Sequence, residues 1–274
     1  MNAEELGKLN DLALSVLKVS RNTLVIHLRF MDTAISRLRW VSLPETVTNQ
    51  PELLPLAGCG LFTEGTAIVY DPVALCRLYA QEKEAGPRAY LHMVLHCVFR
   101  HFAVAPTVDH MLWDLACDMA VEGVINGLNL PALTTKSAVQ QQSQLQAIAS
   151  NVNHLLTAEK LYYWLQGANL SDSRLAALRE LFSVDDHDIW YMRNVAVNIS
   201  IRTGGGGASD KQQPGGSGGE GSGENGDGNT DGSAAARSAL ERDWRDVAEH
   251  MQTDMETFSK QQGDKAGDMM QNLR

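Results

Sequence analysis

The chain has 274 residues, 44% of them hydrophobic, with 23 Lys and Arg against 33 Asp and Glu. This composition is typical of a globular protein with one sizeable core, and the formal net charge of −10 argues against a nucleic acid partner. No apolar run approaches the roughly 20 residues that span a bilayer, and the first ten residues lack the basic start and apolar block of a signal peptide. We therefore expect no membrane segment and a cytoplasmic location.

Apolar residues recur at helical spacing through residues 3–40. This periodicity predicts two helices with a break near residues 20–22. The strand signal of the chain follows in residues 56–72, where two short β-prone runs, 58–62 and 67–70, flank a turn. Gly65 can supply the positive φ that such a turn demands. We expect a small antiparallel sheet here, within a mainly helical α+β fold.

Residues 89–126 contain two further predicted helices, separated at Ala105 and Pro106. In the first helix His92 and His96 sit four residues apart, which places both imidazoles on one face. Apolar residues occupy the rest of that helix, so its polar line is narrower than on a surface helix. Two adjacent imidazoles in a buried line can bind one metal ion.

The second of these helices carries a row of polar side chains at the same spacing: Asp114, Asp118, Glu122 and Asn126. We expect the two polar lines to meet in a cleft and to combine histidine with carboxylate ligands. The alternative is that Arg88 or Arg100 pairs with these carboxylates and no metal binds, because buried charges need partners whatever the function.

His101 is the weaker ligand candidate. It follows His92 by nine residues and points about 180° away from it on a continuous helix. It can therefore join the site only if the helix ends early.

Four charged residues crowd the segment before Trp190, namely Asp185, Asp186, His187 and Asp188. Carboxylates around one histidine can orient it or bind a cation. The alternative is a solvated loop whose aspartates cap the next helix.

Residues 203–233 contain 13 of the 23 glycines of the chain. Such a segment has too little apolar surface to offset the entropy of ordering, so we predict a flexible linker. The organisation that follows is a domain at 1–202, the linker at 203–233 and a helical segment at 234–274. The last segment carries an amphipathic helix at 240–258, which must dock on the domain or on a partner.

Two motifs carry a family resemblance. An H-x-x-x-H-x-x-x-x-H pattern is followed by W-x-x-A-x-D, at His92, His96, His101, Trp113, Ala116 and Asp118. The pattern resembles the putative metallopeptidase domain of bacterial proteins that often end in a von Willebrand factor A-like domain. The sequence FTEGTAIVYDP at 62–72 is similar to that family's hairpin, and VDDHDIW at 184–190, with Asp186 and His187, is similar to its Asp-Asp-His segment.

The resemblance implies a zincin-like fold in which His92, His96 and Asp118 hold zinc. One departure is Met93, at the position where the family has the Glu of H-E-x-x-H. That Glu accepts a proton from the attacking water, and a thioether cannot. The resemblance thus supports metal binding more strongly than hydrolysis and implies a pseudoenzyme, unless Asp114 or Glu122 substitutes as the base.

The resemblance also bears on partners. A peptidase would act on a protein or peptide, and families of this type are associated with MoxR-type AAA+ ATPases. The alternative function is therefore a non-catalytic interaction or adaptor module that works with such an ATPase.

Overall fold

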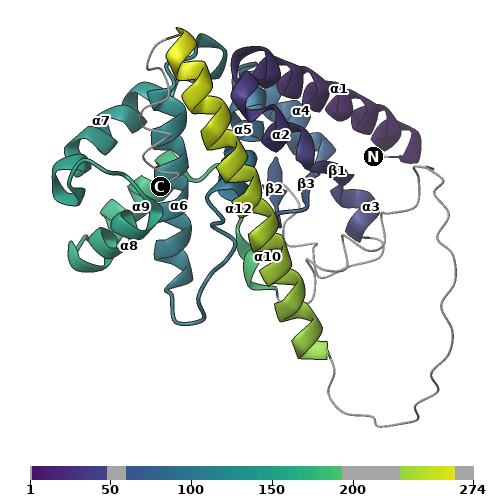
Figure 1. Ribbon diagram of the computed structural model, residues 1–274. Helices are drawn as coiled ribbons and strands as arrows, with labels where there is room; N and C mark the ends of the chain where they lie inside the picture. The colour runs from purple at the N-terminus through teal and green to yellow at the C-terminus, as the bar shows by residue number, and fades with distance from the viewer. Residues whose placement is uncertain (1, 48–59, 193–228, 263–274) are drawn as a thin grey trace, which may run out of the picture.

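The computed structural model describes residues 2–47, 60–192 and 229–262 (Figure 1). The mainly helical α+β class is confirmed, because a small three-stranded sheet is surrounded by helices. None of the helices in these ranges is both long and apolar enough to cross a membrane. Most of the predicted linker, residues 203–228, lies outside the described residues.

Helix α1 (Ala3–His27) runs without interruption through the expected break. Residues 20–22 contain neither Gly nor Pro, and Ser20 is buried at 1% exposure, so packing keeps this turn helical. The chain turns instead at Leu28, whose N–H donates to Leu24 O. Short elements follow: η1 (Arg29–Met31), α2 (Asp32–Arg37), β1 (Arg39–Ser42) and α3 (Leu43–Val47).

The sheet has the order β1-β3-β2. Strands β2 (Leu61–Thr63) and β3 (Ala67–Tyr70) form the expected antiparallel hairpin, and Gly65 has a φ of +101°. Strand β1 was not expected and pairs in parallel with β3, with Trp40 opposite Ile68. Its four residues are too short for a periodic signal, and only the distant partner strand makes them extended.

Helix α5 (Ala85–Val98) lies at the centre of the molecule, and all of its residues from Gly86 to Val98 are buried. Helices α1 and α4 (Pro72–Gln81) pack on one side of it. On the other side lies α6 (His110–Gly127), followed by a helical layer (Figure 1). That layer consists of α7 (Ala138–Ala149), η4 (Ser150–Val152), α8 (Ala158–Gly167) and α9 (Asp172–Phe182). The short η3 (Pro131–Leu133) contacts α5, and α10 (Asp188–Tyr191) lies against the hairpin.

The C-terminal helix α12 (Asn229–Gln262) crosses the sheet side of the molecule (Figure 1) and contacts η1, α2 and α5. Trp244 is fully buried, and its Nε1–H donates to Gly65 O at 2.7 Å. Asp243 pairs with Arg37 at 2.8 Å. The hairpin turn is therefore held from the C-terminal end of the described chain.

Candidate metal centre

Helix α5 presents His92 and His96 side by side, with ring centroids 4.5 Å apart and both side chains fully buried. The four-residue spacing places both rings toward α6, where Asp118 lies at 1% exposure. Asp118 Oδ1 is 3.2 Å from His92 Nε2 and 3.4 Å from His96 Nε2. The two polar lines inferred from the sequence therefore lie together at these three residues.

A fourth residue, Asp185, comes from the segment between α9 and α10. Its side chain is 1% exposed, and its Oδ1 is 3.4 Å from His92 Nε2 and 3.8 Å from His96 Nε2. One ligand atom from each of His92, His96, Asp118 and Asp185 lies within 4.8 Å of the others.

The sequence placed Asp185 in a crowded segment that could bind a cation, but the candidates named there were Asp186 and His187. Asp186 Oδ1 instead accepts the backbone N–H of Asp188, the first residue of α10, at 2.8 Å. The available signal was the crowding of carboxylates around His187 in one short segment, because such a group can bind a cation.

His187 lies against the same carboxylates. Its Nε2 is 3.0 Å from Asp185 Oδ1 and 3.3 Å from Asp118 Oδ1, while its Nδ1 is 3.5 Å from Asp114 Oδ1. Trp190 stacks on the imidazole at a centroid distance of 3.9 Å. Asp114 also accepts a hydrogen bond from Tyr191 Oη at 2.5 Å.

His101 joins the cluster because the helix ends early. Helix α5 stops at Val98, Arg100 adopts a φ of +58°, and His101 N–H donates to His96 O at 3.0 Å. A 2.9 Å hydrogen bond then joins His101 Nδ1 to His96 Nδ1, on the side of His96 that faces away from Asp118. Trp113 holds the turn, since its Nε1–H donates to His101 O at 3.2 Å.

Glu122 orients His92. Its Oε1 accepts a hydrogen bond from His92 Nδ1 at 2.8 Å, and its Oε2 accepts from Arg88 Nε at 2.8 Å. Arg88 therefore pairs with Glu122 and not with Asp118. Met93, next to His92, is fully buried in the hydrophobic core.

Burial sets the protonation of the metal-free centre. Burial lowers the pKa of His92, but the adjacent carboxylates of Asp118, Asp185 and Glu122 raise it well above the ordinary value. For His187, burial again lowers the pKa, and the charges of Asp185 and Asp118 raise it well above normal. Burial raises the pKa of Asp118 to about 6, and burial with the charge of His92 lowers the pKa of His96 well below its usual range.

The donor set fits a divalent cation. Four buried polar atoms of the centre have no hydrogen-bond partner among the described residues: His96 Nε2, His187 Nε2 and both carboxylate oxygens of Asp185. Each such atom costs about 1–3 kcal/mol if it stays unpartnered. Because the charge of Glu122 is matched by Arg88, Asp118 and Asp185 leave two negative charges for a cation to neutralise.

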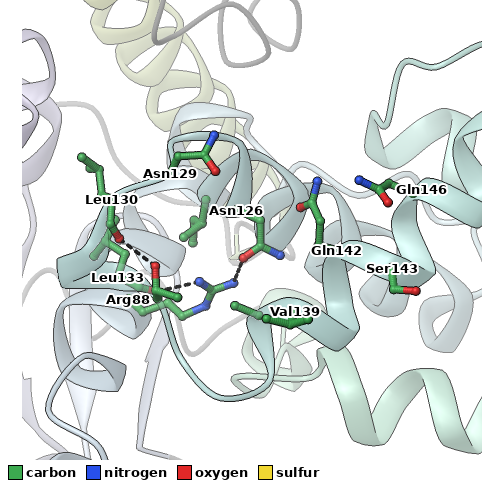
Figure 2. Close-up of a pocket in the computed structure, with 12 residues that line it drawn as sticks. Arg88, Asn126, Asn129, Leu130, Leu133, Val139, Gln142, Ser143 and Gln146 are labelled. Carbon is green, nitrogen blue, oxygen red and sulfur yellow. Dashed lines mark hydrogen bonds between the residues drawn. The ribbon is translucent and has the colours of Figure 1, made fainter.

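A separate cavity of about 530 Å³ lies behind this centre, between the end of α6, η3 and α7 (Figure 2). Arg88 lines it and donates to Leu133 O and to Asn126 Oδ1, as the dashed lines in Figure 2 show. The guanidinium also binds Glu122 and Gln141, so its donors are already engaged. None of the four clustered residues lines this cavity.

Comparison with known proteins agrees with this site. A family model described as "Putative metallopeptidase domain" matches residues 56–273, a range that includes α5, α6 and the segment with Asp185. No curated protein and no solved structure matches the chain. Because the matched range covers well over half of the 274 residues, the chain belongs to the family of putative metallopeptidase domains.

Proposed function

We propose that this protein is a zinc-binding, peptidase-like module whose capacity for hydrolysis is impaired. The observation that carries the proposal is the convergence of His92, His96, Asp118 and Asp185 on one point inside the protein. Imidazole and carboxylate groups are ligands that zinc prefers.

The residues around these donors fix their orientation. Glu122 accepts from His92 Nδ1, which leaves His92 Nε2 to face Asp118. His101 binds His96 Nδ1 in the same manner, which leaves His96 Nε2 for a metal. Histidine ligands typically have an outer partner of this kind, because it sets the tautomer and the ring orientation. When bound, zinc would polarise a carbonyl group and lower the pKa of a water molecule.

We infer impaired hydrolysis from the residues that would have to accept the proton of the attacking water. Met93 has no proton-accepting atom at the motif position of the usual Glu. Glu122 binds His92 with one oxygen and Arg88 with the other, and Asp114 is held by Tyr191 and His187. Neither carboxylate is free to act as the missing base, a role typically worth about 10²–10⁴-fold in rate.

Metal content tests the first half of the proposal. Protein purified without chelator or affinity tag should contain about one zinc ion per chain by elemental analysis. Asp185→Asn should lower zinc affinity by at least about 10-fold, because it removes a charged ligand oxygen. Asp186→Asn is the matched control, since this neighbouring carboxylate binds the backbone N–H of Asp188 and is not one of the four clustered residues. Metal-free protein, or equal losses in both variants, would refute the site.

Peptide hydrolysis tests the second half. Wild type, Met93→Glu and Met93→Gln should be compared on unfolded protein and mixed peptides, with zinc content measured for each. The Gln variant controls for placing a polar group at a fully buried position. We expect negligible cleavage by wild type and Met93→Gln, and a gain with Met93→Glu. If wild type cleaved peptides as fast as the Glu variant, and a chelator stopped this cleavage, the proposal that hydrolysis is impaired would be wrong.

The enclosure of the centre favours a second candidate, a non-catalytic interaction module. His92, His96 and Asp118 are at most 1% exposed, and structural zinc sites are closed whereas catalytic ones keep an open position. The partner that the family resemblance implies is a MoxR-type AAA+ ATPase. Co-purification of such an ATPase with the full chain, with a change in its ATP turnover, would support this role. An unchanged turnover in the absence of a complex would exclude it.

A further inference from the structure

We infer that His187 is an additional ligand of the metal centre, through Nε2, so that three histidines hold the ion together with the two aspartates. The inference rests on the proposed metal site and deepens it. The four-residue cluster at His92, His96, Asp118 and Asp185 does not include His187.

The first argument is donor spacing. Ligands at roughly 2.1 Å from zinc lie about 3.0 Å apart at an angle of 90° and about 3.4 Å apart at a tetrahedral angle. His187 Nε2 is 3.0 Å from Asp185 Oδ1 and 3.3 Å from Asp118 Oδ1. The corresponding distances for His96 Nε2 are 3.8 Å and 3.4 Å. His187 Nε2 therefore has the spacing of a metal ligand relative to the two aspartates.

The second argument is that His187 Nε2 makes no hydrogen bond with the carboxylate beside it. Although His187 Nε2 and Asp185 Oδ1 are close, the pair lacks hydrogen-bond geometry, and both atoms are buried without a hydrogen-bond partner in the described part of the chain. His96 Nε2 is likewise buried without a hydrogen-bond partner among the described residues. A simple ion pair would have left His187 aligned with a carboxylate oxygen, since a charged hydrogen bond is short and direct.

The third argument is a pattern common to the three histidines. Each directs Nε2 toward Asp118 and Asp185, and each has a different residue at Nδ1. The Nδ1 partners are Glu122 for His92, His101 for His96 and Asp114 for His187. An outer partner at one ring nitrogen is typical of histidines that bind a metal through the other.

The ring of His187 is also fixed before any metal binds. Trp190 stacks on it with the ring planes 22° apart, and Trp190 Nε1–H donates to Thr63 O at 2.8 Å. Arg237 of α12 donates to Trp190 O at 2.9 Å. The segment that carries Asp185 and His187 is thus anchored to both the hairpin and the C-terminal helix, so little entropy is lost when it binds an ion.

Five protein donors have a functional consequence. Three imidazoles and two carboxylates would leave little room for the water and substrate that a catalytic zinc ion must accept. The ion would instead link α5, α6 and the segment before α10. Ligation by His187 is therefore a second cause of impaired hydrolysis beside Met93, so the gain expected with Met93→Glu is partial.

X-ray absorption spectroscopy of the zinc-loaded full chain tests the inference without any mutation. We expect scattering from three imidazoles in wild type, whereas two imidazoles would overturn the role of His187. A wild type that binds no zinc would overturn the proposed function as well, so the two failures can be told apart.

A variant pair gives a second readout. Zinc affinity, measured by competition with a chelating dye, should fall by at least about 100-fold in His187→Ala. His110→Ala is the matched control, because His110 lies nearby, stacks on Tyr191 at 3.6 Å and faces no carboxylate of the centre. Circular dichroism confirms that both variants fold. Unchanged affinity in a folded His187→Ala would overturn the inference.

Discussion

At the level of single residues, the negative charges of two buried carboxylates in the centre are balanced by the protonated histidines that face them. In the metal-free protein the raised pKa values of His92 and His187 favour their protonated forms. These two protons offset the charges of Asp118 and Asp185. A divalent ion would supply the same charge.

Zinc binding at pH 7 should therefore release protons. Because the pKa values of His92 and His187 lie well above 6.5 without metal, both rings are protonated at neutral pH and must lose a proton to become ligands. We expect about two protons released per zinc ion, and an affinity that rises with pH. Calorimetry in buffers of different ionisation enthalpy measures this number. A heat of binding that does not depend on the buffer would contradict the charge balance.

At the level of elements, the early end of α5 determines where His101 lies. Arg100 holds a left-handed conformation with a φ of +58°, which reverses the chain after Phe99. For a residue with a side chain this conformation costs roughly 1 kcal/mol, and glycine adopts it without that cost.

Arg100→Gly should consequently raise the free energy of unfolding slightly, by up to about 1 kcal/mol, and leave zinc affinity unchanged. Arg100→Val should lower the free energy of unfolding by about 1–2 kcal/mol, because a β-branched residue is strained at positive φ. Urea denaturation measures both changes. Lys18→Gly, at an exposed position inside α1, is the control and should cost about 1 kcal/mol. If Arg100→Gly lost as much stability as Lys18→Gly, the Arg100 side chain would contribute more to stability than the relief of its backbone strain.

At the level of the whole molecule, the hairpin turn connects the C-terminal helix with the candidate metal centre. Two tryptophans donate to it, Trp190 to Thr63 O and Trp244 to Gly65 O. A side chain at Gly65 would be strained by the φ of +101°, and its Cβ would lie 2.9 Å from Leu240 Cδ2 and 3.2 Å from Phe102 Cε1, so neighbouring side chains would have to shift. The docking of α12 therefore supports the segment that carries Asp185.

Substitutions of Trp244 should destabilise the whole protein. Trp244→Ala leaves a cavity in the core and should lower the free energy of unfolding by about 3–5 kcal/mol. Trp244→Phe keeps most of the volume but leaves Gly65 O without its donor, at a cost of about 1–3 kcal/mol. Asp243→Asn breaks only a surface ion pair with Arg37, and we expect less than about 1 kcal/mol. Thermal or urea unfolding that did not separate these variants would mean that α12 is not part of the cooperative core.

The sequence by itself indicated which helical residues of the candidate site share a face. His92, His96 and Asp118 could be identified because a helix repeats every 3.6 residues, so spacing along the chain predicts which side chains share a face. The hairpin was predictable for a similar reason, since a glycine between two β-prone runs is a local signal. Each of these features depends on residues that are close in the chain.

Only the tertiary structure decided the rest. Strand β1 exists because β3 pairs with it, and α1 continues through residues 20–22 because the core packs against Ser20. Asp185 and His187 reach the centre from a segment about 90 residues after His92, and no period relates such distant positions. Glu122 and Asp114 were the candidate substitutes for the base that Met93 replaces. In the structure Glu122 binds His92, and Asp114 lies beside His187. Side-chain roles of this kind depend on contacts between distant segments, which local periodicity does not encode.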